Sequence, residues 1–179
     1  NSQSGKGGIG FILEQNYGYA LPKMMREHFS YKVKSISDRK HSELKPDEIL
    51  EIFEKFYMNR TKPVNVTEAH FEQKDGITAT VTIDINGDTV EKTASGNGRL
   101  DAVSNAIKQC IGNKYVIEHY SEHSLTHGSN SDAIAYVGIR TKAGELAWGT
   151  GTDSDIIKSG IKALVSACNQ MEEQEKKAD

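Results

Sequence analysis

Residues 77–111 read ITATVTIDINGDTVEKTASGNGRLDAVSNAIKQCI, and this stretch contains one complete pattern of strand, turn, strand and helix. Apolar and polar residues alternate from Ile77 to Ile85, which is typical of a β-strand with one buried face. Asn86-Gly87 then favours a tight hairpin turn, because both central positions of that turn need a positive φ. The chain returns along a second strand, residues 88–94, and an amphipathic helix is predicted over residues 100–111.

The same order of elements recurs about 54 residues further on, a spacing that indicates internal duplication. Apolar residues alternate over 133–139, Lys142-Ala143-Gly144 favours a turn, and residues 145–148 form the returning strand. One further strand precedes each hairpin, at 66–74 and at 115–126, and the second helix is predicted over 155–171. The sequence therefore predicts an α+β domain built from two βββα units.

Each unit carries a glycine-rich turn before its helix, Gly96-Asn97-Gly98 in the first and Gly149-Thr150-Gly151 in the second. Glycines let a ligand approach the backbone closely, and the free N–H groups of a helix start attract a carboxylate. Two such turns favour a ligand-binding module over a catalytic centre.

Acidic residues follow both turns, namely Asp101, Asp153 and Asp155. Capping its helix is the favoured role of each, and holding the ammonium group of a ligand is the alternative. The sequence leaves both roles open.

The first part of the chain has a different character. We expect a short apolar strand at 9–13, a helix that begins near Leu21-Pro22, a second helix that begins at Pro46, and a linker at 59–63. The predicted organisation is a small strand-plus-two-helix subdomain over 1–63, followed by the duplicated domain over 64–179 with units at about 64–112 and 113–172.

Composition excludes several classes of partner. The 179 residues carry a net charge of −3, which does not indicate nucleic-acid binding, and no apolar run reaches membrane-spanning length. Cys110 and Cys168 both fall on apolar helix stripes, so we expect two buried thiols in a cytoplasmic protein. Because the chain begins at Asn1, we expect a fragment of a longer protein.

Catalytic motifs are poorly represented. Residues 4–8, SGKGG, lack the spacing of a nucleotide-binding loop. His119, His123 and His127 would span about 26 Å along a strand, too far to share one metal ion. We therefore expect no catalytic residue, cofactor or metal ion in this chain.

Three stretches, residues 95–103, 120–128 and 148–156, resemble the C-terminal regulatory domain of 2-isopropylmalate synthase, and residues 1–13 resemble the segment that joins that domain to its catalytic barrel. The resemblance implies a leucine-biosynthesis acyltransferase that condenses acetyl-CoA with 2-oxoisovalerate in a (β/α)₈ barrel holding a divalent metal. This chain would be the linker subdomain and the regulatory domain without that barrel. It would be inactive alone, would form a homodimer, and would bind L-leucine for feedback inhibition.

The resemblance also implies a leucine pocket near the glycine turns. Carried onto this sequence, it comprises ten residues: Leu100, Asp101, Ile117, Tyr120, Ser124, Ser131, Ala133, Gly149, Gly151 and Thr152. Core packing is the alternative role for several of them, Ile117 and Ala133 especially. Three other functions stay open: the isoleucine-sensing domain of citramalate synthase, a dimerisation module without a ligand, and a free-standing enzyme.

Overall fold

The computed structural model describes residues 6–127 and 130–178, and the chain divides into two compact units, Asn1–Phe56 and Tyr57–Asp179. The first unit is helical, with α1 (Lys6–Tyr17), α2 (Lys23–Lys40) and α3 (Pro46–Tyr57). α2 begins after Pro22, and Pro46 is the first residue of α3, where a missing N–H costs nothing. These two helices were predicted.

The strand predicted at 9–13 is wrong, because this segment lies inside α1. Ile9, Ile12 and Leu13 are buried while Phe11 is 62% exposed. This spacing of i, i+3 and i+4 places the three buried side chains on one face of a helix. Periodicity cannot distinguish a helix from a buried strand in so short an apolar run.

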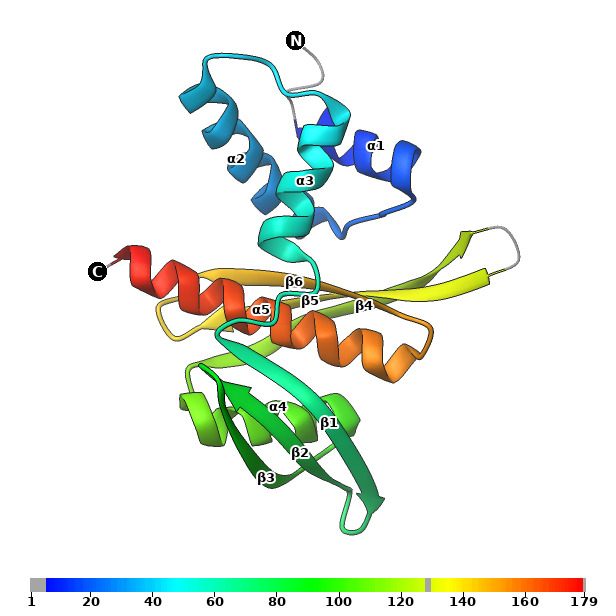
Figure 1. Cartoon of the computed structure of the whole chain (residues 1–179), viewed down its shortest axis with the longest axis vertical. Helices are drawn as coiled ribbons and strands as arrows, with labels where there is room; N and C mark the ends of the chain where they lie inside the picture. The colour runs from blue at the N-terminus through cyan, green and yellow to red at the C-terminus, as the bar shows by residue number, and fades with distance from the viewer. Residues whose placement is uncertain (1–5, 128–129, 179) are drawn as a thin grey trace. The chain divides into compact units, whose positions relative to one another are not determined.

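The second unit contains the two predicted βββα repeats, so the α+β class is confirmed (Figure 1). Both sheets are antiparallel and have three strands, in the orders β1-β2-β3 and β4-β5-β6. The elements are β1 (Val64–Gln73), β2 (Ile77–Ile85), β3 (Asp88–Gly96), α4 (Arg99–Ile111), β4 (Tyr115–His127), β5 (Asn130–Thr141), β6 (Leu146–Asp153) and α5 (Ile156–Ala178).

The first hairpin forms where its sequence predicts it. Asn86 and Gly87 have φ values of 53° and 91°, and the Gly87 N–H donates to Asp84 Oδ1 over 2.8 Å. The turn fixes the β2–β3 register and directs Ala79, Val81 and Ile83 into the core.

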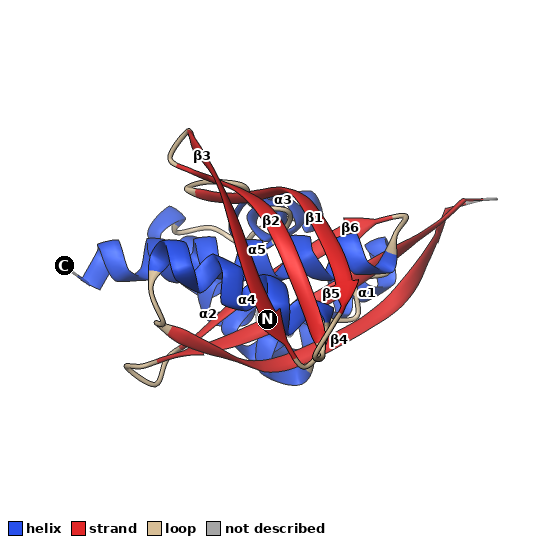
Figure 2. Cartoon of the chain, turned by 90° about the horizontal axis from the view of Figure 1, so that it is seen from below, coloured by secondary structure: helices blue, strands red, loops and turns tan. Residues whose placement is uncertain are grey.

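Both repeats share one core. α4 packs on β2 and β3, α5 packs on β5 and β6, and α5 also contacts β1 (Figure 2). In return, Tyr115 of β4 reaches α4, where its hydroxyl group lies 2.8 Å from Ser104 Oγ. Each helix therefore contacts its own sheet and the first strand of the other repeat.

Buried polar residues of α5 hold the segment that leads into β1. Ser166 Oγ donates to the Tyr57 carbonyl oxygen over 2.7 Å, and Asn169 exchanges hydrogen bonds with the Val64 backbone. Asn169 Nδ2 also donates to the carbonyl oxygen of Arg60. These hydrogen bonds hold residues 57–64 against α5.

Among the described residues, no helix combines the length and apolar character needed to cross a bilayer.

Candidate functional site

The first glycine turn lies where the sequence predicts it, between β3 and α4. Gly98 precedes α4 in an extended conformation, and the Asp101 carboxylate accepts the Asn97 N–H over 2.9 Å. A Cβ at Gly96 would lie 2.6 Å from that same carboxylate oxygen. Asp101 therefore ties the turn to the first turn of its helix, and Leu100 beside it is partly buried against the core.

The second glycine turn is not a turn, which corrects the prediction. Gly149 and Gly151 lie inside β6, opposite Val137 and Ala135 of β5. A Cβ at Gly149 would clash with the α5 backbone at Ala163 and Ala167. These glycines allow a helix to lie unusually close to a strand, and that helix, not a ligand, fills the space they leave.

The acidic residues before α5 have structural partners. Asp155 Oδ1 accepts the N–H groups of Ile157 and Lys158, as an N-cap does. Asp153 Oδ2 accepts a hydrogen bond from Lys162 over 2.8 Å. Burial raises the pKa of the Asp153 carboxyl, but this bond, the Asp155 N–H and nearby lysine charges outweigh burial, and the net pKa is lowered.

Seven of the ten predicted residues lie on the α5-facing side of the second sheet, five of them on β4 and β5 and the other two, Gly149 and Gly151, on β6. Opposed residues of an antiparallel pair lie on the same face. Ala135, Val137 and Ile139 form the buried row of β5. Ser131 and Ala133 continue this row along β5, and Ile117, Tyr120 and Ser124 of β4 lie opposite it. Tyr120 is 46% exposed, and its hydroxyl group donates to Glu122 over 2.6 Å. Burial and that carboxylate raise the pKa of the Tyr120 hydroxyl group.

Part of this face lies on a projecting arm. β6 pairs with β5 only from Ala133 to Arg140, so the ends of β4 and β5 beyond Ala133 form a two-stranded hairpin, which extends past the rest of the sheet (Figures 1 and 2). Ser124 and Ser131 are exposed on this arm.

Thr152 does not join the others. It is paired with Ile134 and so lies on the opposite face, where its N–H donates to Asn59 Oδ1 over 3.0 Å and its hydroxyl oxygen accepts from Asn59 Nδ2. None of the ten residues lines either of the two clefts described below.

One cleft of about 470 Å³ lies in the second unit, between β1 and the first turns of α5. Its apolar lining is Val66, Ala69, Phe71, Ile157 and Ile161, and its charged lining includes Asp153, Asp155, Lys158 and Lys162. No role in ligand binding was predicted from the sequence for these apolar residues.

The duplication relates this cleft to the predicted pocket. β1 has a bulge after Val66 and β4 has one after Ile117; three residues further on in each strand lie Ala69 and Tyr120. The two helix starts match in the same way. Ile157 is the second residue after Asp155, which caps α5, and Leu100 is the second residue after Gly98, which precedes α4. The next residue is Lys158 in α5 and Asp101 in α4. Four predicted residues, Leu100, Asp101, Ile117 and Tyr120, are thus the counterparts of four residues that line the cleft, Ile157, Lys158, Val66 and Ala69.

Two of the three histidines have partners of other kinds. His119 stacks on Trp148 with ring centroids 5.2 Å apart, and His123 Nε2 lies 2.8 Å from the Tyr136 hydroxyl oxygen. The side chain of His127, and residues 1–5 of the glycine-rich lead-in, lie outside the described residues. Within the described part of the chain, no three histidine, cysteine or acidic residues gather as a metal site would require.

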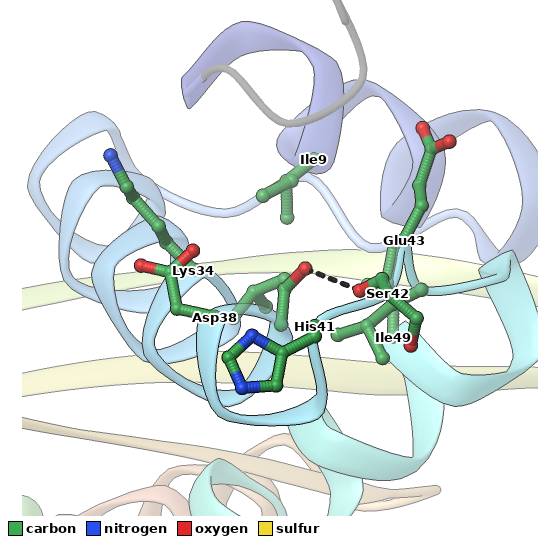
Figure 3. Close-up of a pocket in the computed structure, with 10 residues that line it drawn as sticks. Ile9, Lys34, Asp38, His41, Ser42, Glu43 and Ile49 are labelled. Carbon is green, nitrogen blue, oxygen red and sulfur yellow. Dashed lines mark hydrogen bonds between the residues drawn. The ribbon is translucent and has the colours of Figure 1, made fainter.

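The helical unit has a hollow of its own, about 680 Å³, between α1, α2 and α3 (Figure 3). Ile9 and Ile49 line it, and Ser37 Oγ donates to the Ser42 carbonyl oxygen over 2.7 Å at its edge. The charged ends of Lys34 and Glu43 extend outwards on opposite sides.

Comparison with known proteins decides the family. A sequence profile of the LeuA allosteric (dimerisation) domain matches residues 43–172. The chain belongs to this family. The LeuA domain profile thus spans both βββα repeats and begins within the helical unit.

Curated relatives agree with the LeuA assignment. The chain is 47% identical over 171 residues to the 2-isopropylmalate synthase of Desulfitobacterium hafniense, covering 96% of this chain and 31% of that protein. It is 45% identical to the same enzyme of Helicobacter hepaticus and 38% identical to that of Brucella melitensis, covering 96% of this chain and 32% of each relative. The chain therefore spans about a third of the length of these relatives, and it corresponds to their C-terminal regulatory part.

Proposed function

We propose that this chain is the regulatory part of a 2-isopropylmalate synthase, that it binds L-leucine as a feedback inhibitor, and that it pairs as a homodimer. The observation that carries the proposal is the match of both βββα repeats to an allosteric and dimerisation domain. Acetyl-CoA condensation and its divalent metal would belong to a catalytic barrel elsewhere in the whole protein, and this chain would be inactive without it.

The proposed leucine site comprises the start of α4 and the part of β4 from Ile117 to Ser124. Leu100 and Ile117 are partly buried and would form apolar walls for the isobutyl group, whose burial contributes about 1.5–3 kcal/mol. The Asp101 carboxylate would hold the ammonium group with the oxygen that Asn97 does not use. Ser124, Ser131 and Ala133 are small and would leave room at the far end.

The remaining three predicted residues would act indirectly. Gly149 and Gly151 set how closely α5 approaches the sheet whose face carries the site, and Thr152 anchors Asn59 on the other face. Their substitution would alter leucine binding only through the position of α5 or of residues 57–64.

The projecting β4–β5 arm supports the homodimer. A two-stranded hairpin is marginal by itself in water and gains stability when a further surface covers it. A second copy of the chain would supply that surface next to the proposed site. Leucine bound there would then bias the arrangement of the dimer, with a coupling of about 1–3 kcal/mol to the catalytic part.

Calorimetric titration of the chain with L-leucine tests the proposal. We expect saturable heat, and a dissociation constant raised at least about tenfold in Leu100→Ala, since an apolar wall is lost. Leu146→Ala is the matched control, because Leu146 is a partly buried leucine at the other end of the sheet.

Three outcomes separate the alternatives. Stronger binding of isoleucine than of leucine would favour the citramalate synthase sensor. Absence of heat with every amino acid, from a folded dimer at millimolar ligand, would leave a dimerisation module. Acyl transfer by the isolated chain would indicate an enzyme instead.

A further inference from the structure

The cleft between β1 and α5 is the counterpart, under the internal duplication, of the proposed leucine site, and it differs from that site in charge. Position for position, Val66 and Ile157 supply the same apolar character as Ile117 and Leu100. Lys158, however, stands where the first repeat has Asp101. A ligand in this cleft would meet a cation where a ligand in the first site meets an anion.

The charged residues around the cleft differ in their partners. Lys162 is bound to Asp153 over 2.8 Å, so these two charges offset each other. Within residues 6–127 and 130–178, Lys158 makes no ion pair, and its ammonium group is exposed at the rim. Asp155 caps α5 through Oδ1 and lies three residues from Lys158. The rim therefore presents one carboxylate and one ammonium group close together.

The interior of the cleft is apolar. Val66, Phe71 and Ile161 line it, and Ile161 is only 8% exposed. The volume of about 470 Å³ lies within the range of roughly 300–1,000 Å³ that accommodates small ligands. Glu68 also lines the cleft, and its carboxylate oxygen Oε2 lies 3.7 Å from Nε2 of His70 on the same strand.

We infer that this cleft is a second site for an aliphatic α-amino acid. Lys158 binds the ligand carboxylate, Asp155 binds its ammonium group, and the side chain lies between Phe71 and Ile161. The inference deepens the proposed function, because it gives the duplicated fold two effector sites of opposite polarity in each chain.

The test is calorimetric stoichiometry with L-leucine on the whole chain, at chain concentrations above the dissociation constant. We expect two molecules per chain for the unmodified protein and one for Lys158→Met, with affinity at the cleft reduced at least about tenfold. Asp155→Asn should also lose the cleft site, since asparagine keeps the helix cap but removes the charge. Lys142→Met, in an exposed hairpin, is the matched control and should retain two sites.

Ligand analogues provide an independent readout. Leucinamide lacks the carboxylate and 4-methylpentanoate lacks the ammonium group, so neither should fill the cleft at concentrations that saturate it with leucine. One site per chain that Leu100→Ala weakens and Lys158→Met leaves unchanged would overturn this inference alone. Two sites that both survive Lys158→Met would also overturn it. Absence of any binding would overturn the proposed function as well.

Discussion

Replacing Gly149 by alanine is expected to push α5 away from β6 and to destabilise the second unit. The added Cβ would lie 2.8 Å from the carbonyl carbon of Ser166, and nearer still to backbone atoms of Ala163 and Ala167. Non-bonded carbons rest about 3.5–4.0 Å apart, so the helix must retreat by roughly 1 Å. No side chain can rotate to relieve a clash with backbone, and we expect a cost at the upper end of the overpacking range, about 2–3 kcal/mol.

A second glycine makes the reasoning sharper. Gly151 faces the same helix one turn away, where a Cβ would lie 2.7 Å from Lys162 Cβ. One displacement of α5 relieves both clashes, so the double variant should cost clearly less than the sum of the two single variants. The matched control is Gly160→Ala on α5, whose Cβ would lie at an ordinary 3.4 Å from the Tyr120 hydroxyl oxygen. It should be neutral or stabilising by up to about 1 kcal/mol, because alanine favours helix.

Urea unfolding measures these free energies. Trp148 is the only tryptophan in the chain and directly precedes Gly149, so its fluorescence follows the second unit. An unchanged unfolding free energy for Gly149→Ala, or additive costs in the double variant, would refute the close-approach role of these glycines.

Four further predictions concern a buried polar residue, the two thiols and an ion pair. Asn169→Ala should lower the unfolding free energy by about 2–4 kcal/mol in a urea titration, because backbone groups of Arg60 and Val64 lose their hydrogen-bond partner. A loss below about 1 kcal/mol would contradict the role of Asn169 in holding residues 57–64 against α5. Burial raises the pKa of the Cys168 thiol to about 12, so stability should fall by about 1.4 kcal/mol per pH unit above pH ~8.5, a slope that Cys168→Ala removes. In thiol labelling at pH 8, half-buried Cys110 should react before Cys168, and equal rates would argue against this packing. The lowered pKa of Asp153 contributes stability above pH ~4 that is lost as pH falls through the folded-state value. Lys162→Met should therefore destabilise the protein at pH 7 more than at pH 3, and an equal effect at both would count against the pair.

The repeated strands could be predicted because their signals are local. Alternation from Ile77 to Ile85 and the Asn86-Gly87 turn determine one hairpin without help from the rest of the chain. The segment 9–13 was misassigned because its helical face is defined by what it packs against. Gly149 and Gly151 were misassigned for a related reason: a glycine that allows a turn and a glycine that admits a helix look the same in sequence.

The candidate site was only partly predictable. Capping by Asp155 and the turn at Gly96–Gly98 follow from neighbouring residues. The cleft does not, because Val66 and Ile161 lie far apart in sequence and each fits the pattern of an ordinary core position. The equivalence of the two repeats emerges only when strand bulges and helix caps are placed in register.

Nuclear magnetic resonance of the isotopically labelled chain, recorded during titration with L-leucine, tests whether this domain is a leucine sensor. We predict saturable shifts of the backbone amides of Leu100, Asp101, Ile117, Tyr120 and Ser124. Amides that stay unmoved at these positions, with millimolar leucine and a folded chain, would contradict the assignment of this domain as a leucine sensor.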